Sequence, residues 1–273
     1  MTSSPSDSGQ PPASGLDPNV AHSARVWNYW LGGKDNYKID RVVAAEFEET
    51  FPGIVDIARQ VRHFLFRAIR YLVVEAGVRQ FLDIGTGLPT ANNTHEIAQG
   101  LVPHARIVYV DNDPLVLVHA RALLTSSPEG ATDYVDADLR DPGTILREAA
   151  RTLDFTQPIG LMMLAILGHI PDSDHPHAIV RGLLDALPSG SYLALSDDTD
   201  TDAANNEATQ TYNQNPKAAN PYHLRSPEQI ARFFDGLELV EPGVVSTSQW
   251  RPEPSRWGQP VEISHYAGVG RKP

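Results

Sequence analysis

FLDIGTGLPT, residues 81–90, decides the fold of this 273-residue chain. It begins as a short apolar strand. Gly85 and Gly87 follow at a spacing that allows a tight turn and a close approach of a ligand to the backbone. Asp83 precedes this turn, and a carboxylate at the end of a buried strand is hard to justify by packing. The stretch therefore predicts the first strand and the ligand-binding turn of an α/β sheet. A dinucleotide fingerprint would need a third glycine at position 90, where the chain has Thr90.

Two further motifs place acids at the ends of the next expected strands. VYVDNDP (108–114) ends its strand at Asp111, where doubly wound folds hold ribose hydroxyls. DADLRDP (136–142) ends its strand at Asp138, which can accept a hydrogen bond from the amine of adenine. A pyrophosphate would be repelled by neighbouring carboxylates, whereas a cationic group would be attracted. The three acids therefore favour an adenosine ligand without phosphate.

Strand and helix patterns alternate through the middle of the chain. The expected strands are 80–85, 106–112, 132–138, 159–167 and 191–198, with helices near 91–100, 114–125, 142–152 and 174–187. Near-continuous apolar strands separated by helices predict a parallel, doubly wound sheet covered on both faces. After a polar insert (199–225) and a short helix that begins at Ser226, the segments 237–245 and 261–272 follow without a helix between them. They predict an antiparallel hairpin that closes one edge of the sheet.

The N-terminal third reads differently from the rest. Residues 1–20 are rich in Ser, Pro, Gly and Asp, and we expect a disordered tail. Residues 21–77 have the 3.6-residue period of helices, most clearly over 54–76, and predict an N-terminal helical cap or lid. The remaining residues, 78–273, are expected to form the ligand-binding domain.

Composition excludes several function classes. The 34 acidic residues exceed the 22 Lys and Arg residues and give a net charge of −12, so a nucleic-acid partner is not expected. The absence of cysteine removes disulfides, thiol catalysis and cysteine zinc sites. The longest apolar run is half the length that a membrane span needs, and no export signal is present. We expect a cytoplasmic protein with a small-molecule substrate and no membrane partner. The sequence has no signal for an oligomeric state.

The motifs DIGTG, VDNDP and DADLRDP, the apolar strand before LGHIP and the helix–hairpin ending resemble S-adenosylmethionine-dependent methyltransferases with the Rossmann-like fold. SARVWNYWLGGKDNY, together with GTGLPTANNTHEIAQ, SQWRP and YAGVGRK, resembles a narrower bacterial S-adenosyl methyltransferase family, long known only as a domain of unknown function. The resemblance covers about residues 20–272. It implies the fold and the cofactor S-adenosyl-L-methionine, but no particular methyl acceptor.

The resemblance also implies roles for individual residues. Asp83, Gly85 and Gly87 would shape the methionine side of the pocket, and Asp111 would hold the ribose hydroxyls. Asn112, Asp138 and Leu139 would surround the adenine. Residues 165–169, from Ala165 to His169, would form the floor between the cofactor and the acceptor.

Catalytic candidates are fewer, because methyl transfer needs proximity more than particular side chains. His169 or Asp172 could accept a proton from an oxygen or nitrogen acceptor. The turn GGKDNY (32–37) predicts a lid in which Trp27 and Trp30 anchor the segment and Lys34 or Tyr37 faces the acceptor. A helical cap that only covers the sheet is the alternative.

Other polar groups have simpler interpretations. His175 and His177 are expected to be exposed beside a helix start, so no metal site is predicted. The run DDTDTD (197–202) is expected to be a solvated face. The insert residues Tyr212, Asn213, Tyr222, His223 and Arg225 either line the acceptor pocket or lie on the surface.

Two other functions remain open at this point. A non-catalytic protein that binds S-adenosylmethionine or a partner could keep the same fold, and turnover would distinguish it from an enzyme. A nicotinamide-dependent reductase is disfavoured by Thr90, by Asp138 and by the lack of a Tyr-x-x-x-Lys pair.

Overall fold

The computed structural model describes residues 17–123, 125–254, 258 and 260–273. An eight-stranded sheet forms its centre, with the strand order β3-β2-β1-β4-β5-β8-β6 and with β7 paired to β8. Strands β1 to β5 pair in parallel, and β8 runs antiparallel to β5, β6 and β7. The prediction of a mostly parallel, doubly wound sheet with antiparallel C-terminal strands is confirmed. The C-terminal strand lies inside the sheet, however, and the two-residue β6 lies beyond it.

The strands are β1 Gln80–Ile84, β2 Arg106–Asp111, β3 Ala131–Asp136, β4 Gly160–Leu164, β5 Tyr192–Asp198, β6 Glu238–Leu239, β7 Val245–Ser246 and β8 His265–Arg271. The α-helices are α1 Ser23–Trp30, α2 Lys38–Thr50, α3 Ile54–Val74, α4 Thr94–Leu101, α5 Pro114–Leu123, α6 Pro142–Ala149, α7 Pro176–Asp185, α8 Ala203–Gln214 and α9 Pro227–Ala231.

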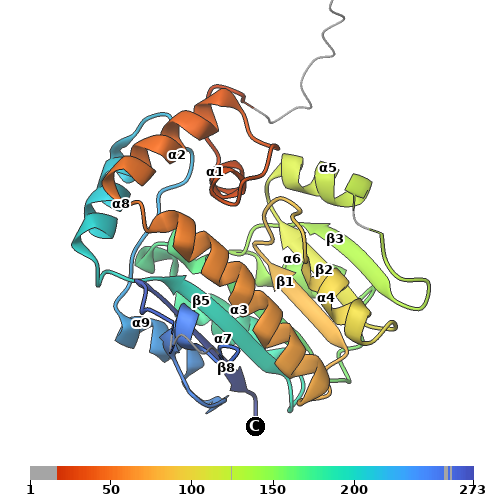
Figure 1. Cartoon of the computed structure of the whole chain (residues 1–273). Helices are drawn as coiled ribbons and strands as arrows, with labels where there is room; N and C mark the ends of the chain where they lie inside the picture. Colours follow the sequence, from red (N-terminus) through yellow and green to blue (C-terminus); the bar gives the residue numbers. More distant parts are fainter. Residues whose placement is uncertain (1–16, 124, 255–257, 259) are drawn as a thin grey trace, which may run out of the picture.

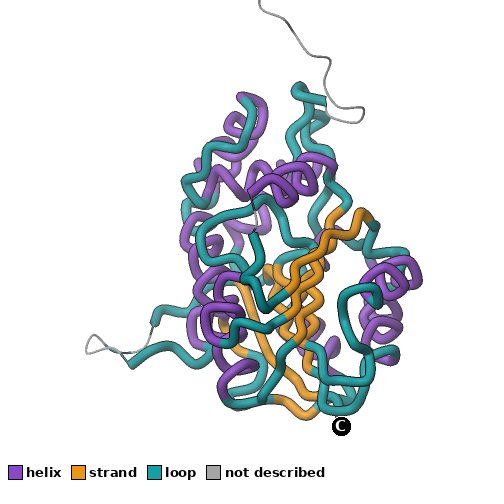
Figure 2. Tube along the Cα trace, turned by 90° about the vertical axis from the view of Figure 1, so that its right-hand side faces the viewer, coloured by secondary structure: helices purple, strands orange, loops and turns teal. Residues whose placement is uncertain are grey.

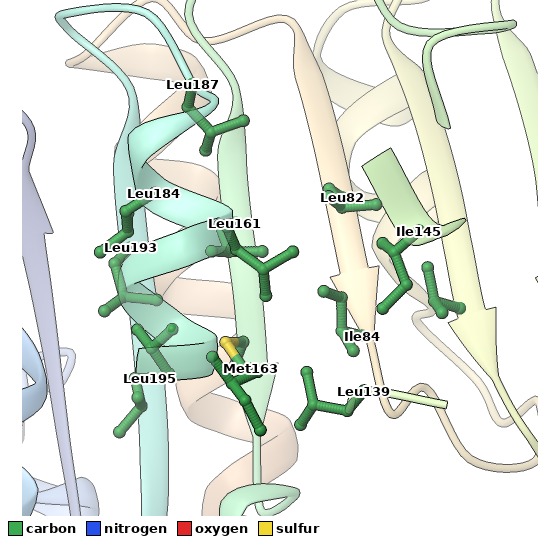
Figure 3. Close-up of a cluster of buried hydrophobic side chains, with 14 of the residues drawn as sticks. Leu82, Ile84, Leu139, Ile145, Leu161, Met163, Leu184, Leu187, Leu193 and Leu195 are labelled. Carbon is green, nitrogen blue, oxygen red and sulfur yellow. The ribbon is translucent and has the colours of Figure 1, made fainter. Parts of the chain in front are cut away.

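Helices cover both faces of the sheet (Figures 1 and 2). On one face α3 and α4 pack on Phe81, Met162 and Ala194. On the other face, α6, α7 and α9 pack on the alternate residues of the same strands, including Leu82 and Met163 (Figure 3). This two-sided burial explains why the strands read as continuous apolar runs in the sequence.

Helices α1, α2 and α8 form a third group above the carboxyl ends of the parallel strands (Figure 1). They share an apolar cluster with the first half of α3, where Ile54 and Val61 are buried. The second half of α3, from Phe64 onward, belongs to the layer on the sheet. Helix α3 is therefore common to the predicted cap (21–77) and the sheet layer, and the division of the chain at residue 77 stays a prediction.

Two local predictions differ from the structure or lie outside it. Helix α8 occupies the insert that was expected to be polar loop; Asp202 caps it through the N–H groups of Ala204 and Asn205, and Tyr212 packs below. Its weak hydrophobic period hid it, because only a few of its residues are buried. Most of the predicted disordered tail lies outside the described residues, and the structure describes residues 17–20 as a turn.

Candidate functional site

A cavity of about 270 Å³ lies at the carboxyl ends of the parallel strands, beneath α1, α2 and α8. Ligands of open α/β sheets bind at this edge, where the strand order reverses between β1 and β4. Most of the predicted site residues line the cavity, including one of the two predicted bases: Asp83, Gly85, Gly87, Asp111, Asn112, Asp138, Leu139, Ala165 and His169. Leu167 and Gly168 of the predicted floor and the other predicted base, Asp172, are not among the lining residues.

Asp83 is a buried acid at the end of β1. Thr94 donates a hydrogen bond from Oγ1 to its Oδ2 at 2.5 Å. Burial raises the pKa of Asp83 to about 6, although the Thr94 hydrogen bond and the charge of Arg62 oppose the shift. The carboxyl group is therefore poised to titrate just below neutral pH.

The glycine turn brings backbone close to the cavity. Gly85 has a φ of 74°, and a side chain there would lie within 2.5 Å of Cγ1 of Ile166. Gly87 has a φ of 63°, and its N–H donates to Oδ2 of Asp111 at 2.9 Å. Glycine is favoured at Gly85 by both the left-handed φ and the short approach, and at Gly87 by the left-handed φ alone, since a side chain there would meet no atom within 4 Å.

Asp111 ties this turn to the start of α5. Its Oδ1 accepts the N–H of Asp113 at 2.9 Å, while Oδ2 accepts the N–H of Gly87. Burial raises the pKa of Asp111, and these two N–H groups limit the rise. Each carboxylate oxygen keeps a lone pair, because a carboxylate offers about four acceptor sites.

The polar side chains after β2 and β3 form the next part of the wall. Asn112 donates from Nδ2 to Oδ2 of Asp138 at 3.3 Å. Arg140 pairs with Asp138 at 3.3 Å and with Asp174 at 2.6 Å. Leu139 is buried beside them. Asp141 caps α6 by accepting the N–H of Thr144.

His169 lies in the short turn after β4. Its Nδ1 is 3.1 Å from the carbonyl oxygen of Pro221, so Nδ1 is the protonated nitrogen and Nε2 keeps a lone pair. Burial lowers the pKa of His169 to about 4, and the ring is neutral at pH 7. Ala165, at the start of the same segment, has a left-handed φ of 54°.

A chain of aromatic rings lines the rest of the cavity. Trp27 and Trp30 of α1, Phe47 of α2 and Tyr212 of α8 all belong to its lining. Successive ring centroids are 5.9, 5.3 and 6.2 Å apart, with edge-to-face or tilted geometry. Such contacts stabilise each ring pair by about 0.5–1.5 kcal/mol beyond burial. The sequence pointed to the two tryptophans but missed Phe47.

Lys34 and Tyr37 do not belong to the cavity lining. Both side chains are exposed on the turn between α1 and α2. The turn folds around Asn28, whose Oδ1 accepts from Asp35 N at 3.1 Å and from Asn36 Nδ2 at 2.9 Å. The turn thus keeps Lys34 and Tyr37 outside the lining in this structure, and their role at the acceptor stays a prediction.

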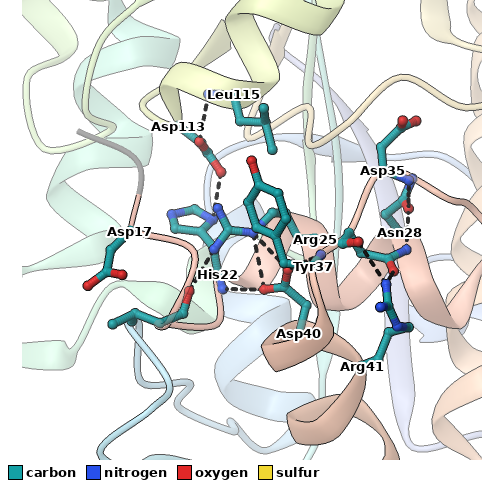
Figure 4. Close-up of polar contacts among 12 residues, drawn as sticks. Asp17, His22, Arg25, Asn28, Asp35, Tyr37, Asp40, Arg41, Asp113 and Leu115 are labelled. Carbon is teal, nitrogen blue, oxygen red and sulfur yellow. Dashed lines mark hydrogen bonds and ion pairs between the residues drawn. The ribbon is translucent and has the colours of Figure 1, made fainter. Parts of the chain in front are cut away.

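One ion pair and one histidine–carboxylate contact hold α1 in place (Figure 4). Arg25 pairs with Asp40 at 2.9 Å, and both side chains are buried. His22, which lines the cavity, is 2.9 Å from Oδ2 of Asp113. Burial alone would raise the pKa of Asp113, but the contact with His22 outweighs it and lowers that pKa. The contact between His22 and Asp113 therefore links the start of α1 to the loop after β2, where Asp113 also donates its N–H to Asp111.

The end of β5 corrects a prediction. Asp197, Asp198 and Thr199 are 1%, 5% and 0% exposed, so the DDTDTD run does not begin as a solvated face. Asp198 lines the cavity, and so does Asn205 of α8. The sequence signal was present, because these acids follow an apolar strand just as Asp83 does.

Two of the five candidate residues from the insert, Tyr212 and Tyr222, line the cavity. Asn213 instead pairs with the backbone of Tyr222 at 2.7 and 2.8 Å. Arg225 donates to the carbonyl oxygens of Leu167 and Ile170. His223 is exposed. These three residues shape the loop instead of the lining.

Arg62 of α3 was also missed. It lines the cavity near Asp83 and donates to the carbonyl oxygens of Ala91 and Asn92. Across the described ranges, no group of three His, Cys, Asp or Glu residues is arranged to hold a metal ion. Nor is any helix of those ranges both long and apolar enough to cross a bilayer.

Comparison with known proteins places this geometry in context. A family model described as S-adenosyl methyltransferase matches residues 9–273. A DUF574 family protein of Streptomyces avermitilis MA-4680 is 44% identical, with a TM-score of 0.89 over 94% of this chain and 99% of that one. A protein of Thermobifida fusca YX, described only provisionally as a methyltransferase, is 40% identical, with a TM-score of 0.86 over 96% and 98%.

More distant structures share the fold alone. The plantazolicin methyltransferase BpumL, solved with S-adenosylhomocysteine, is 10% identical, with a TM-score of 0.51 over 92% of this chain and 95% of that one. The search of curated proteins found no match.

Proposed function

This chain belongs to the S-adenosyl methyltransferase family and uses S-adenosyl-L-methionine, and we propose that it transfers the methyl group to a small-molecule acceptor by in-line displacement. One observation supports this most: strand-end acids with a glycine turn and a wall of aromatic rings share one cavity. Its volume of about 270 Å³ is just below the roughly 300–1,000 Å³ typical of small-molecule sites.

The donor groups of the cavity fit this cofactor. Asp111 has lone pairs left for two ribose hydroxyls, and the Asn112–Asp138 pair offers acceptors to the adenine amine. Asp83 fits the ammonium of the methionine part, since opposite charges attract strongly at a buried site. Lys and Arg side chains of the kind that would clamp a pyrophosphate are limited, in the described lining, to Arg62 and Arg140.

The protein's contribution to the reaction is mainly positional. When bound, S-adenosylmethionine supplies a methyl group on a positively charged sulfur. Ala165, Ile166 and His169, in the segment after β4, line the same cavity as the acids and the aromatic rings and so would orient the acceptor. Correct orientation can supply up to roughly 7–11 kcal/mol of the barrier. Rings on α1, α2 and α8 would exclude water.

Calorimetry and a turnover assay test the proposal. S-adenosylmethionine and S-adenosylhomocysteine should bind, whereas NAD should not. Incubation with a mixed metabolite extract should then release S-adenosylhomocysteine faster than incubation without it. Tight NAD binding without S-adenosyl binding would refute the cofactor assignment. Binding without acceptor-dependent release would instead support a non-catalytic protein.

Cofactor affinity should fall as the pH drops through about 6, because Asp83 has a raised pKa of about 6 and loses its charge there. At pH 7 the carboxylate attracts the methionine ammonium, and below pH 6 the loss approaches tenfold per pH unit. Calorimetry between pH 5 and 8 measures the slope. The Asp83→Asn variant should bind the cofactor more weakly at pH 7, and its affinity should change less with pH than that of the parent. Asp111, whose pKa is also raised, is present in both proteins and so does not account for a difference between the two slopes. An unchanged slope in the variant assigns the effect to another group.

His169→Asn should lower turnover about tenfold, because the neutral Nε2 can accept one hydrogen bond that orients the acceptor. S-adenosylhomocysteine affinity should stay within about twofold of the parent. His223→Asn is the matched control, since this neighbouring histidine is exposed and outside the lining. Equal turnover in both variants removes His169 from the acceptor site.

A further inference from the structure

Two buried polar groups in the cavity wall lack hydrogen-bond partners. Asp198 is 5% exposed and Asn205 is 1% exposed, and both line the cavity. Among the described residues, neither Oδ1 of Asp198 nor Nδ2 of Asn205 has a partner. A buried polar group without a partner is strongly disfavoured, so each such group in a folded protein needs an explanation. A ligand that donates a hydrogen bond to Oδ1 of Asp198 and accepts one from Nδ2 of Asn205 would explain both groups.

The neighbours of Asp198 are already engaged with one another. Asp197 accepts a short hydrogen bond from the hydroxyl of Tyr222, and its Oδ2 lies 3.9 Å from Arg225. Opposite Asp198 on β8 is His265, whose Nδ1 contacts Oγ1 of Thr247 at 2.7 Å. Burial lowers the pKa of His265 to about 3, so it offers no positive charge at pH 7.

Charge is unevenly distributed over the cavity wall. Arg62 lies near Asp83, and Arg140 pairs with Asp138, so both cations of the described lining belong to the cofactor half. In the acceptor half the described lining contains Asp198 without a lysine or arginine beside it. An anionic acceptor would be repelled there, and a cationic one attracted.

The aromatic wall favours the same kind of ligand. Trp27, Trp30, Phe47 and Tyr212 give the part of the cavity that we assign to the acceptor an aromatic, apolar lining that suits a ring. The faces of such rings also attract ammonium groups within about 6 Å. A carboxylate beside aromatic rings is the usual environment for an amine on an apolar skeleton.

We propose that the methyl acceptor is an amine on an aromatic skeleton, with its nitrogen held by Asp198 and a neighbouring oxygen held by Asn205. This inference rests on the proposed function and specifies its substrate class. Asp198 is then both the specificity-determining residue and the proton acceptor. A proton passes from the ammonium to Oδ1: the N–H bond breaks, its electron pair stays on nitrogen, and an O–H bond forms. The neutral amine that results can act as the nucleophile.

The electrostatics agree with this role. Burial and the adjacent charge of Asp197 raise the pKa of Asp198 well above its usual range. The raised pKa makes the Asp198 carboxylate a stronger base, and the positive charge of a bound ammonium would favour its ionised form at this buried position.

Matched probes test the inference by calorimetry with the S-adenosylhomocysteine-loaded protein. The amine probe is 2-amino-1-phenylethanol, the hydroxyl probe is 1-phenylethane-1,2-diol, and the carboxylate probe is mandelate. The amine should bind at least about tenfold more tightly than the diol, and mandelate should bind least. Equal affinities, tighter diol or mandelate binding, or no amine binding up to about 10 mM overturns the inference.

Asp198→Asn should abolish the preference for the amine and leave S-adenosylhomocysteine affinity within about twofold. If the Asp198→Asn variant does not fold, the Asp198→Ser variant is measured in its place. Asp200→Asn is the control, because Asp200 is exposed two positions further along the chain. A preference that survives in a folded Asp198 variant overturns the inference.

Turnover separates this inference from the proposed function. Release of S-adenosylhomocysteine with hydroxyl acceptors but not with amines refutes the substrate class and keeps the methyltransferase. Specific amine binding without methyl transfer keeps the amine site and refutes the transfer.

Discussion

Replacing Asp111 by alanine weakens S-adenosylhomocysteine binding by about 30- to 150-fold. That factor corresponds to about 2–3 kcal/mol, the value of hydrogen bonds to a charged group. The variant loses the acceptor proposed for the ribose hydroxyls. It also frees the N–H of Gly87, which now donates to Asp111 at 2.9 Å and fixes the glycine turn. Calorimetry measures the affinity, and the melting temperature shows whether the sheet stays folded.

Asp136→Asn is the matched control for this experiment. Asp136 pairs with Asp111 in the register of β2 and β3 but is exposed and outside the cavity lining. Its replacement should leave the affinity within about twofold. If Asp111→Ala binds as tightly as the control, the ribose is held elsewhere.

Replacing Asp40 by alanine should lower the free energy of unfolding by about 3–5 kcal/mol, because the Arg25 guanidinium is then buried without its counter-charge. Asp40 accepts the N–H of His22 at 3.0 Å and that of Tyr37 at 2.7 Å, in addition to Nε of Arg25 (Figure 4). Only the carbonyl oxygen of Val20 then still accepts from the guanidinium among the described residues. Urea unfolding followed by tryptophan fluorescence measures the loss.

Asp56→Ala provides the comparison for the buried pair. Asp56 and Arg59 form an exposed pair at 3.5 Å, which contributes at most about 1 kcal/mol. The double variant that removes both Arg25 and Asp40 should lose less than the sum of the single variants, because no unpaired charge remains. Additive losses, or a loss below about 1 kcal/mol for Asp40→Ala, contradict a stabilising role for this pair.

The part of the cavity that we propose for the cofactor, around Asp83, Asp111 and Asp138, could be predicted from the sequence because these residues follow directly on strands. Asp83, Asp111 and Asp138 each come at or just after the end of an apolar run, and parallel strands bring such ends to one edge. Local pattern and three-dimensional position therefore coincide there. The same reasoning, applied to Asp198, would have found the buried acid at the end of β5.

The part of the cavity that we propose for the acceptor depends on contacts that no local sequence pattern predicts. Phe47 meets Tyr212 through the packing of α2 on α8, and α8 has little hydrophobic period of its own. The prediction for Lys34 and Tyr37 took aromatic neighbours as evidence of a lid. In the structure the tryptophans face the cavity while the turn itself is held outside it by Asn28.

The long separation between α2 and α8 has a consequence for how the chain is synthesised. Asn215, just after α8, contacts Glu46 of α2 across 169 positions of sequence. At about 5–20 residues per second, a ribosome completes α8 roughly 10–30 s after α2. Until then the rings of α1 and α2 lack their cover, while the strands that supply the cofactor edge are already made. During synthesis, the strand ends that we propose for the cofactor are therefore complete before α8 completes the aromatic part of the cavity. In that interval the apolar side chains of α1 and α2 are exposed, and they are the part of the chain to which a chaperone would bind.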